Sequence, residues 1–375
     1  MGSTKKVTRL TEADLFIFFS HAMGNRKIRV LFNVCADAEN YNAQSLNARE
    51  IALRLDPERF HSTLFFERTL DPRLARTGIR LVKLPERRRT LRLLREMLGD
   101  YDAILYMDLS PASYAYLHVP RLVRRSTRTV LSIEGTRGNL DDVSKAIRRY
   151  ADYVVRHADL RVAISEFVAH DSEDLTGVRA DCIIPVGVDT NTFHPPEGRD
   201  CKVPTVLFVG HLIERKGPHL FIEAARQFPE TQFRLVGSPR GQFGEDLRKK
   251  CKSLPNVRLE NPMPQARLAD VLRESDLLLH PSRIEGVPKV TLEAAASGMP
   301  SIVFDDYQTP SVVDGVTGFQ VKTFDEMLAR LKLLIRDGAL RKKMGAAAVA
   351  HAQGYDWRHV AARWAQTVEH LVRQG

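Results

Sequence analysis

The 375-residue chain contains few cysteines, and they are widely scattered. The four are Cys35, Cys182, Cys201 and Cys251, and no two have the close spacing of a zinc or redox motif. This distribution argues against a disulfide framework and against a structural zinc site, and it fits a reducing compartment. We therefore expect a cytoplasmic location.

The chain also lacks long apolar runs. No stretch of about 18 consecutive apolar residues occurs, so no segment is predicted to span a membrane. The patch from Leu15 to Phe19 is too short for an export signal, and acidic Glu12 and Asp14 precede it. We expect residues 1–25 to form a leader outside the folded domains.

The motifs of two other protein classes are missing. A nicotinamide site needs a G-x-G-x-x-G turn after its first strand, and residues 37–44 contain no glycine. No zinc finger, stacking-aromatic motif or helix-turn-helix pattern accompanies the formal charge of +10. Nucleic acid is therefore not an expected partner.

Much of the positive charge lies between residues 80 and 128, which hold eleven Lys or Arg and five Asp or Glu. Within this stretch, Arg87 to Leu98 is basic and amphipathic. The preferred interpretation is a crossover helix with Leu91, Leu94 and Leu98 in the core and arginines in water. The alternative is peripheral contact with an anionic membrane on the inner face, where a lipid-linked acceptor would be presented.

Short apolar runs alternate with longer periodic segments, which predicts parallel sheets covered by helices. Predicted strands are 27–34, 62–66, 79–84, 103–107, 129–133, 205–209, 233–236, 257–259, 277–279 and 301–304. Predicted helices are 45–55, 91–98, 112–125, 220–227, 266–274, 290–297 and 324–335. The segment 193–198 is predicted to be a linker because it is rich in breakers. We therefore predict two doubly wound α/β units with a ligand cleft at their strand ends.

The segment from His280 to Pro300 carries the clearest chemical signal. Gly286 permits close backbone approach after a strand, and Pro288 suits the first turn of a helix whose free N–H groups can bind an anion. Glu285 and Glu293 can face one ligand, and a carboxylate can accept two hydrogen bonds from vicinal hydroxyls. Their spacing alone is uninformative, because Glu50 and Glu58 repeat it in what we expect to be an ordinary surface helix and turn.

A second motif runs from Phe208 to Gly217 and includes Gly210, His211, Arg215 and Lys216. It predicts a strand followed by a glycine loop with two adjacent cations. Such cations stabilise the charge that develops on a departing diphosphate, and they do so without a metal ion.

These motifs resemble the Glu-x7-Glu signature and the glycine loop of glycosyltransferase family 4, whose members have the GT-B fold of two Rossmann-like domains. By this resemblance Glu285 contacts donor sugar hydroxyls, Glu293 holds the nucleotide ribose, and Gly286 and Val287 approach the sugar and diphosphate. Lys216 matches the family's lysine, whereas His211 stands where an arginine is usual.

The resemblance extends to other donor-site positions. It places Gly237 at a strand end facing the cleft and Met263 near the base. Glu134 stands where the family commonly has a histidine that touches the donor sugar. Two interpretations of Glu134 stay open: contact with a sugar hydroxyl or a cationic acceptor, and a structural ion pair with Arg137.

The resemblance also implies the domain plan. An N-terminal acceptor-binding domain would comprise residues 26–190 plus 357–375, and a nucleotide-sugar-binding domain residues 200–356. The terminal helix, with Val360, Trp364 and Val368 on one face, would cross back to the first domain, and the alternative is that it belongs wholly to the second.

We therefore predict a hexosyltransferase that moves a sugar from a nucleotide-diphosphate sugar to an acceptor hydroxyl with retention of configuration. No cofactor or metal is expected, and the acceptor is a glycan, a lipid-linked molecule or a small molecule. One alternative is a GT-B-fold nucleotide-sugar epimerase or hydrolase. The other is a non-catalytic nucleotide-sugar-binding protein.

Overall fold

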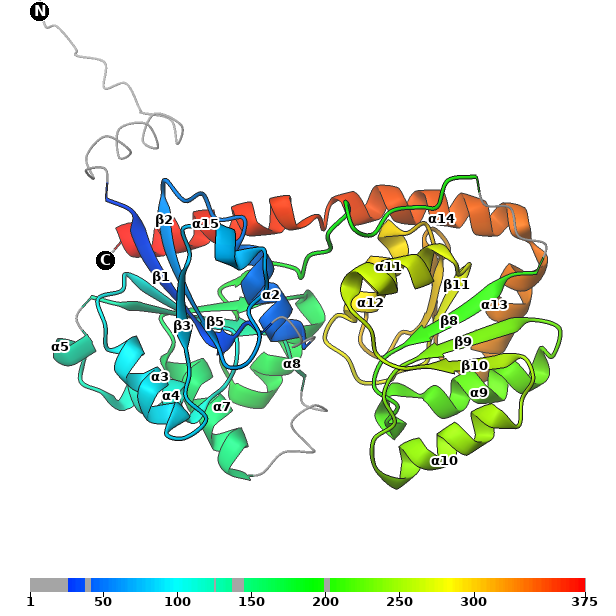
Figure 1. The fold of residues 1–375 in the computed structure, drawn as a ribbon, viewed down its shortest axis with the longest axis horizontal. Helices are drawn as coiled ribbons and strands as arrows, with labels where there is room; N and C mark the ends of the chain where they lie inside the picture. The colour runs from blue at the N-terminus through cyan, green and yellow to red at the C-terminus, as the bar shows by residue number, and fades with distance from the viewer. Residues whose placement is uncertain (1–25, 38–41, 125, 137–144, 199–202, 375) are drawn as a thin grey trace, which may run out of the picture.

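The structure is a computed structural model that describes residues 26–37, 42–124, 126–136, 145–198 and 203–374 (Figure 1). The predicted leader, Arg137 and Cys201 lie outside these ranges. Two parallel sheets with flanking helices make up the described chain, which confirms the predicted pair of Rossmann-like units.

The first sheet has seven strands in the order β3-β2-β1-β4-β5-β6-β7. Their bounds are β1 (Ile28–Cys35), β2 (Phe60–Phe66), β3 (Arg80–Lys83), β4 (Ala103–Tyr106), β5 (Arg128–Ile133), β6 (Leu160–Ala163) and β7 (Cys182–Ile183). The helices of this half are α2 (Ala43–Ala52), η1 (Leu74–Arg76), α3 (Arg89–Met97), α4 (Pro111–His118), α5 (Arg121–Arg124), α7 (Lys145–His157) and α8 (Glu166–Thr176).

The second sheet has six strands in the order β10-β9-β8-β11-β12-β13. They are β8 (Thr205–Val209), β9 (Gln232–Val236), β10 (Val257–Glu260), β11 (Leu277–His280), β12 (Ser301–Phe304) and β13 (Gly318–Val321). The helices are η2 (Glu214–Lys216), α9 (Pro218–Gln227), α10 (Gly241–Lys252), α11 (Gln265–Arg273), α12 (Lys289–Ala296), α13 (Phe324–Arg336), α14 (Gly338–Gln353) and α15 (Trp357–Arg373).

Both sheets are covered on two faces, which explains their apolar central strands. Every residue of β4, β11 and β12 is buried. In the order of each sheet, β1 and β4 are neighbours, as are β8 and β11, and the chain order reverses there. Ligands bind at such switch points in open α/β sheets, beyond the carboxyl ends of the strands.

The predictions for two helices of the first half need correction. The helix predicted over 112–125 is two helices, α4 and α5, because Pro120 cannot continue the hydrogen-bond ladder of α4. In α3 the buried side chains are Leu93 and Met97, and Leu94 packs against the core as predicted. Leu91 and Leu98, also predicted to be in the core, are 63% and 36% exposed. A rotation of the helix by about one residue relative to our prediction accounts for the difference.

The last helix runs alongside the first sheet (Figure 1). Asp356 caps α15 by accepting a hydrogen bond from the Arg358 N–H. Val360, Trp364 and Val368 are buried in one cluster with residues of β1 and α2. No helix among the described residues is long and apolar enough to cross a membrane.

Candidate functional site

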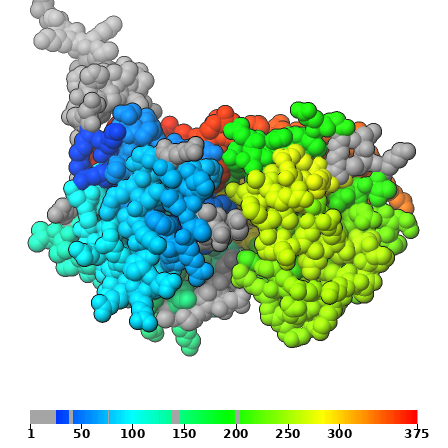
Figure 2. Space-filling model, viewed as in Figure 1, coloured from blue at the N-terminus to red at the C-terminus, as the bar shows by residue number. Residues whose placement is uncertain are grey.

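A cavity of about 340 Å³ lies between the two halves of the molecule. In the space-filling view, the blue and cyan surface of the first half faces the yellow-green surface of the second across a hollow (Figure 2). The lining comprises Ala43, Leu46, Val209, Gly210, His211, Lys216, Val236, Gly237, Ser238, Pro262, Met263, Gln265, Leu268, His280, Glu285, Val287, Pro288, Lys289, Val290 and Glu293. Most of these residues follow β8, β9 and β11 or begin α12, so the cavity lies at strand carboxyl ends and a helix N-terminus.

Two glycines bring the loops after β8 and β9 together. A Cβ atom placed on Gly237 would lie 2.0 Å from the Gly210 carbonyl oxygen. Any side chain at Gly237 would therefore push these loops apart. Both glycines line the cavity.

An ion pair between Lys216 and Glu285 forms part of the cavity lining. The Lys216 ammonium donates a hydrogen bond to the Glu285 carboxylate, and His280 Nε2 lies 3.3 Å from the same Oε1 atom. Burial alone would raise the pKa of Glu285, but Lys216 and His280 outweigh it and lower that pKa below its ordinary value. Burial also lowers the pKa of His280. Glu285 is therefore a carboxylate at neutral pH, held by a neutral imidazole and a cation.

Glu293 lies in α12 and has a different environment. Only 8% of it is exposed. Burial raises the pKa of Glu293 to about 7, although Lys289 and a hydrogen bond with Gln265 favour its charged form. Near neutral pH this carboxyl group can therefore be ionised or protonated, and a ligand that donates hydrogen bonds favours the ionised form.

Arg215 is adjacent to Lys216 in sequence but not in the cavity lining. Its Nη1 atom donates a hydrogen bond to the Ile284 carbonyl oxygen at 2.8 Å. Gly217 follows in the left-handed region with a φ of 70°, and a Cβ atom there would lie 2.1 Å from the Pro281 carbonyl oxygen. In this geometry Arg215 fastens the loop to the segment that carries Glu285, and Lys216 is the cation that faces the ligand space.

His211 lines the cavity where the family pattern has a cation. Burial lowers the pKa of His211, and the nearby charges of Arg240, Lys216 and Arg215 lower it further. This side chain is therefore a neutral imidazole above its lowered pKa, which makes it a hydrogen-bonding group rather than a charge.

Gly286 and Glu134 meet at the contact between the two halves. A Cβ atom on Gly286 would lie 2.4 Å from the Glu134 carbonyl oxygen, so glycine permits the halves to touch there. Neither residue is among the described residues that line the cavity. The Glu134 side chain instead accepts a hydrogen bond from Asn47 Nδ2 at 2.8 Å.

Sequence reasoning missed several lining residues. Lys289 is partly buried beside Glu293, and its ammonium lies 4.9 Å from the centroid of the Trp357 ring. Gln265 begins α11 and hydrogen-bonds Glu293. Ala43 and Leu46 come from α2 in the other half of the molecule. Of these residues, only Lys289 could have been predicted from the sequence, because it directly follows Pro288 in the motif from His280 to Pro300.

The comparison pair Glu50 and Glu58 is not an ordinary surface pair. Glu50 is only 3% exposed, and its carboxylate pairs with Arg54 and with Arg73 at 2.7 Å. Glu58 is exposed, as expected. Glu50 thus has a structural role, since one arginine in the turn after α2 and one in the loop after β2 neutralise it.

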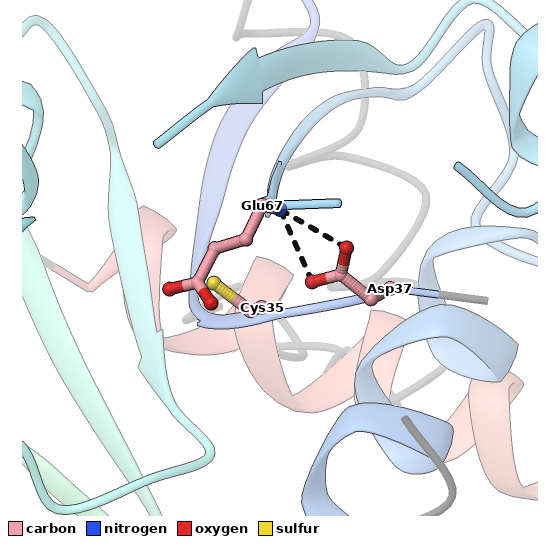
Figure 3. Close-up of side chains that lie close together, drawn as sticks. All are labelled: Cys35, Asp37 and Glu67. Atoms are coloured by element: carbon pink, nitrogen blue, oxygen red, sulfur yellow. Dashed lines mark hydrogen bonds between the residues drawn. The ribbon is translucent and has the colours of Figure 1, made fainter. Parts of the chain in front are cut away.

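One group of residues among those described has the side chains and proximity of metal ligands: Cys35, Asp37 and Glu67 (Figure 3). Asp37 already accepts hydrogen bonds from the backbone N–H groups of Glu67, Arg68 and Thr69. The Arg89 guanidinium pairs with Glu67 at 2.7 Å and approaches the Cys35 sulfur at 3.4 Å. Burial raises the pKa of the Cys35 thiol to about 12, so its sulfur is protonated at neutral pH and is a poor metal ligand. These three residues therefore fit a role in holding the loop after β2 better than a role in binding a cation.

Comparison with known families gives two adjoining matches. The family described as "Glycosyltransferase Family 4" matches residues 46–192, and "Glycosyl transferases group 1" matches residues 189–351. The D-inositol 3-phosphate glycosyltransferase of Nocardia farcinica is 30% identical over 233 residues, which is 56% of this chain and 52% of that protein. The enzyme of the same name from Kribbella flavida is 32% identical over 247 residues, or 58% of each chain. The chain thus matches little more than half the length of these relatives.

Solved structures share the fold over most of the chain. Anabaena HepE, in complex with UDP and glucose, has a TM-score of 0.77 at 18% identity over 92% of this chain and 100% of its own. Sucrose-phosphate synthase from Thermosynechococcus elongatus has a TM-score of 0.75 at 17% identity over 93% of this chain and 100% of its own.

Proposed function

Because this chain belongs to glycosyltransferase family 4, we propose that it transfers a sugar from a nucleotide-diphosphate sugar to an acceptor hydroxyl. The observation that carries the proposal is that one cavity is lined both by the Lys216–Glu285 ion pair and by the buried Glu293. The ion pair suits a sugar diphosphate, and Glu293 suits a ribose diol. The UDP and sugar bound to Anabaena HepE support a ligand of this class.

Each polar group then has a role. Glu285 accepts hydrogen bonds from the donor sugar hydroxyls, and Glu293 accepts them from the ribose. Lys216 and the N-terminal N–H groups of α12 face the diphosphate, where they stabilise the charge of the leaving group. The backbone at Gly210, Gly237 and Val287 lets the phosphates approach closely, while Met263 lies toward the base.

We further propose that the reaction proceeds with retention and without a metal ion. The bond between the anomeric carbon and the phosphate oxygen breaks, and the acceptor oxygen bonds to the same face of that carbon. The leaving phosphate takes the acceptor's proton, so no protein side chain is assigned as the base. Lys216 supplies the positive charge that a metal ion provides in other enzymes.

We propose that each half of the molecule binds one of the two substrates. Residues 26–190 plus 357–375 would bind the acceptor, and residues 200–356 the donor. The packing of α15 against the cluster that contains β1 and α2 residues supports the assignment of the terminal helix to the first domain.

Nucleotide release tests the activity against its rivals. Purified protein is incubated with UDP, GDP and ADP sugars, with and without a pool of acceptors. A transferase releases nucleotide diphosphate faster when acceptor is present, a hydrolase or hydrolysing epimerase releases it equally without acceptor, and a binding protein releases none. A thermal shift with free UDP, GDP or ADP identifies the nucleotide, because a ligand of the native state raises its apparent stability.

We also propose peripheral contact between the first half and an anionic membrane. The support is the exposure of apolar side chains beside arginines: Leu91 is 63% exposed on α3, and Leu122 is 92% exposed between Arg121 and Arg124 on α5. Exposed apolar and basic groups together favour an interface with anionic lipid. Flotation with phosphatidylserine vesicles at low salt should carry the protein upward, and a Leu91→Asp, Leu122→Asp variant should stay at the bottom. Failure of the wild type to float would refute the contact.

A further inference from the structure

Lys289 is the first residue of α12, and Glu293 lies four residues further along the same helix. Residues with this spacing are neighbours on one face of a helix, and both residues line the cavity between the halves of the molecule. Glu293 is almost fully buried, and a buried carboxylate stays ionised only where positive charge or hydrogen-bond donors lie near it. The Lys289 ammonium is a nearby charge that favours the ionised form.

The other half of the molecule holds this ammonium in place. It donates a hydrogen bond to Asn47 Oδ1 on α2, and it lies 4.9 Å from the centroid of the Trp357 ring at the start of α15. An ammonium over an aromatic face is attracted by the electrons of the ring. Trp357 is buried in the cluster that contains residues of β1 and α2, so both contacts come from the first half. Together they fix a side chain that is otherwise long and flexible.

The amide of Asn47 has one favourable orientation. Its Nδ2 atom donates a hydrogen bond to Glu134 Oε1 at 2.8 Å, while its Oδ1 atom accepts the hydrogen bond from Lys289. A flipped amide would turn donor against donor at Lys289 and acceptor against acceptor at Glu134. Ser132 Oγ donates to the same Glu134 oxygen at 3.1 Å. The position of the ammonium is thus set by a chain of contacts that ends at β5 in the first sheet.

The charges around Lys289 and Glu293 act in opposite directions on the two groups. Burial lowers the pKa of Lys289, and the carboxyl groups near it raise that pKa. The charged groups that act on Lys289 are Glu134, Glu293, Glu50 and Arg49. Burial raises the pKa of Glu293 to about 7, against the effects of Lys289 and of a hydrogen bond with Gln265 on α11. Loss of the Lys289 charge should therefore raise the pKa of Glu293 further.

We propose that Lys289 is a positioning residue of the nucleotide site: held by Asn47 and Trp357, it supplies the positive charge that lets Glu293 accept hydrogen bonds from the ribose as a carboxylate. This role rests on the proposed function, which assigns Glu293 to the ribose. Because the partners of the ammonium belong to the first half, the nucleotide site in the second half is complete only while the halves are in contact. Nucleotide binding and this contact then stabilise each other, since coupling between sites is reciprocal.

The pH dependence of nucleotide binding in Lys289→Met tests this role. The methionine side chain is unbranched like that of lysine but carries no charge. Calorimetry uses the nucleotide diphosphate that stabilises the protein most. At pH 7 the variant should bind it about tenfold more weakly than wild type, because Glu293 becomes mostly protonated, and at pH 9 the two affinities should agree within about twofold. An equal loss at both pH values would show direct contact between ammonium and ligand, and it would overturn the proposal, as would an unchanged affinity at pH 7.

A double-mutant cycle separates the charge of Glu293 from other effects. In a Glu293→Gln background no carboxylate remains to be ionised, so adding Lys289→Met should change the affinity at pH 7 by less than about twofold. A further tenfold loss would contradict the proposal. Lys332→Met, at an exposed position of α13, is the matched control and should bind like wild type at both pH values.

Asn47→Leu tests the part played by the first half. It removes both hydrogen bonds of the amide, so the ammonium is no longer held, and affinity at pH 7 should fall about threefold with recovery at pH 9. Unchanged affinity at pH 7 would refute the role of the first half. Wild-type protein that binds no nucleotide diphosphate would refute the proposed function itself, whereas wild-type binding without these pH patterns in the variants would refute only the role of Lys289.

Discussion

Two glutamates line the cavity between the halves of the molecule, and their pKa values are shifted in opposite directions. Glu285 and Glu293 are almost equally buried, at 7% and 8% exposure. Lys216 and His280 lower the pKa of Glu285 below its ordinary value, whereas burial raises the pKa of Glu293 to about 7. Burial by itself thus does not set the charge of a carboxylate, because the partners within hydrogen-bonding distance decide it.

This difference suggests separate tasks for the two glutamates. Glu285 is already paired with Lys216, so these charges are in place before the ligand binds. Glu293 has no equally close cation among the described residues and depends on hydrogen bonds from the ligand to stabilise its charge. We expect the Lys216–Glu285 pair to act mainly on the transition state and Glu293 on nucleotide affinity.

The largest expected effect follows removal of Lys216, the cation that pairs with Glu285. In Lys216→Ala, kcat should fall about 100- to 1000-fold, with less than about a fivefold change in nucleotide affinity, because the lost charge acts mainly on the leaving group. Steady-state kinetics and calorimetry measure the two quantities. Lys249→Ala, which removes an exposed lysine on α10, should leave both unchanged. An unchanged kcat in Lys216→Ala would contradict the assignment.

The opposite pattern is expected for Glu293, where the loss should fall on nucleotide affinity. Glu293→Ala should weaken nucleotide-diphosphate binding about 10- to 100-fold, since a hydrogen bond to a charged group contributes about 1.5–3 kcal/mol. Isothermal titration calorimetry at pH 8 measures this loss. The exposed Glu223→Ala on α9 serves as the control. Equal nucleotide affinity in Glu293→Ala and wild type would contradict the proposal that Glu293 binds the ribose.

The raised pKa of Glu293 predicts a pH dependence. Below a pKa of about 7 the group is protonated and cannot accept two hydrogen bonds, so nucleotide affinity should rise about tenfold between pH 6 and pH 8. Glu285 should not contribute over this range, because its lowered pKa keeps it ionised throughout. Calorimetry from pH 6 to pH 8 tests whether nucleotide affinity rises with pH. If the same pH dependence persists in Glu293→Gln, a group other than Glu293 causes it.

The smallest expected effect concerns His211, the neutral lining residue of the loop after β8. His211→Arg adds a charge near the proposed phosphates, and Lys216 already supplies one, so kcat/KM should rise by only about two- to threefold. Steady-state kinetics at saturating acceptor measures the change. A drop in kcat/KM would show that the imidazole makes a contact that the guanidinium cannot replace.

Much of the fold could be predicted from the sequence, because strands and helix ends depend on residues that are close together in the chain. Buried parallel strands produce continuous apolar runs, and β8 and β12 have the bounds that those runs predicted. Pro120 was a visible breaker within the predicted helix 112–125, and the division between α4 and α5 follows from it. The orientation of α3 was not readable, since both Leu91 and Leu93 are apolar and only packing selects between them.

The sequence by itself determined the fold class, the two-unit organisation and the glycine, proline and glutamate positions of one cavity, because these depend on backbone conformation and short-range order. Only the tertiary structure decided which charges face that cavity. It turned Arg215 toward Ile284, placed Lys216 on Glu285, buried Glu293 beside Lys289, and joined Asn47 to Glu134. Such contacts join residues far apart in the chain, and electrostatic states depend on those distances rather than on neighbours in sequence.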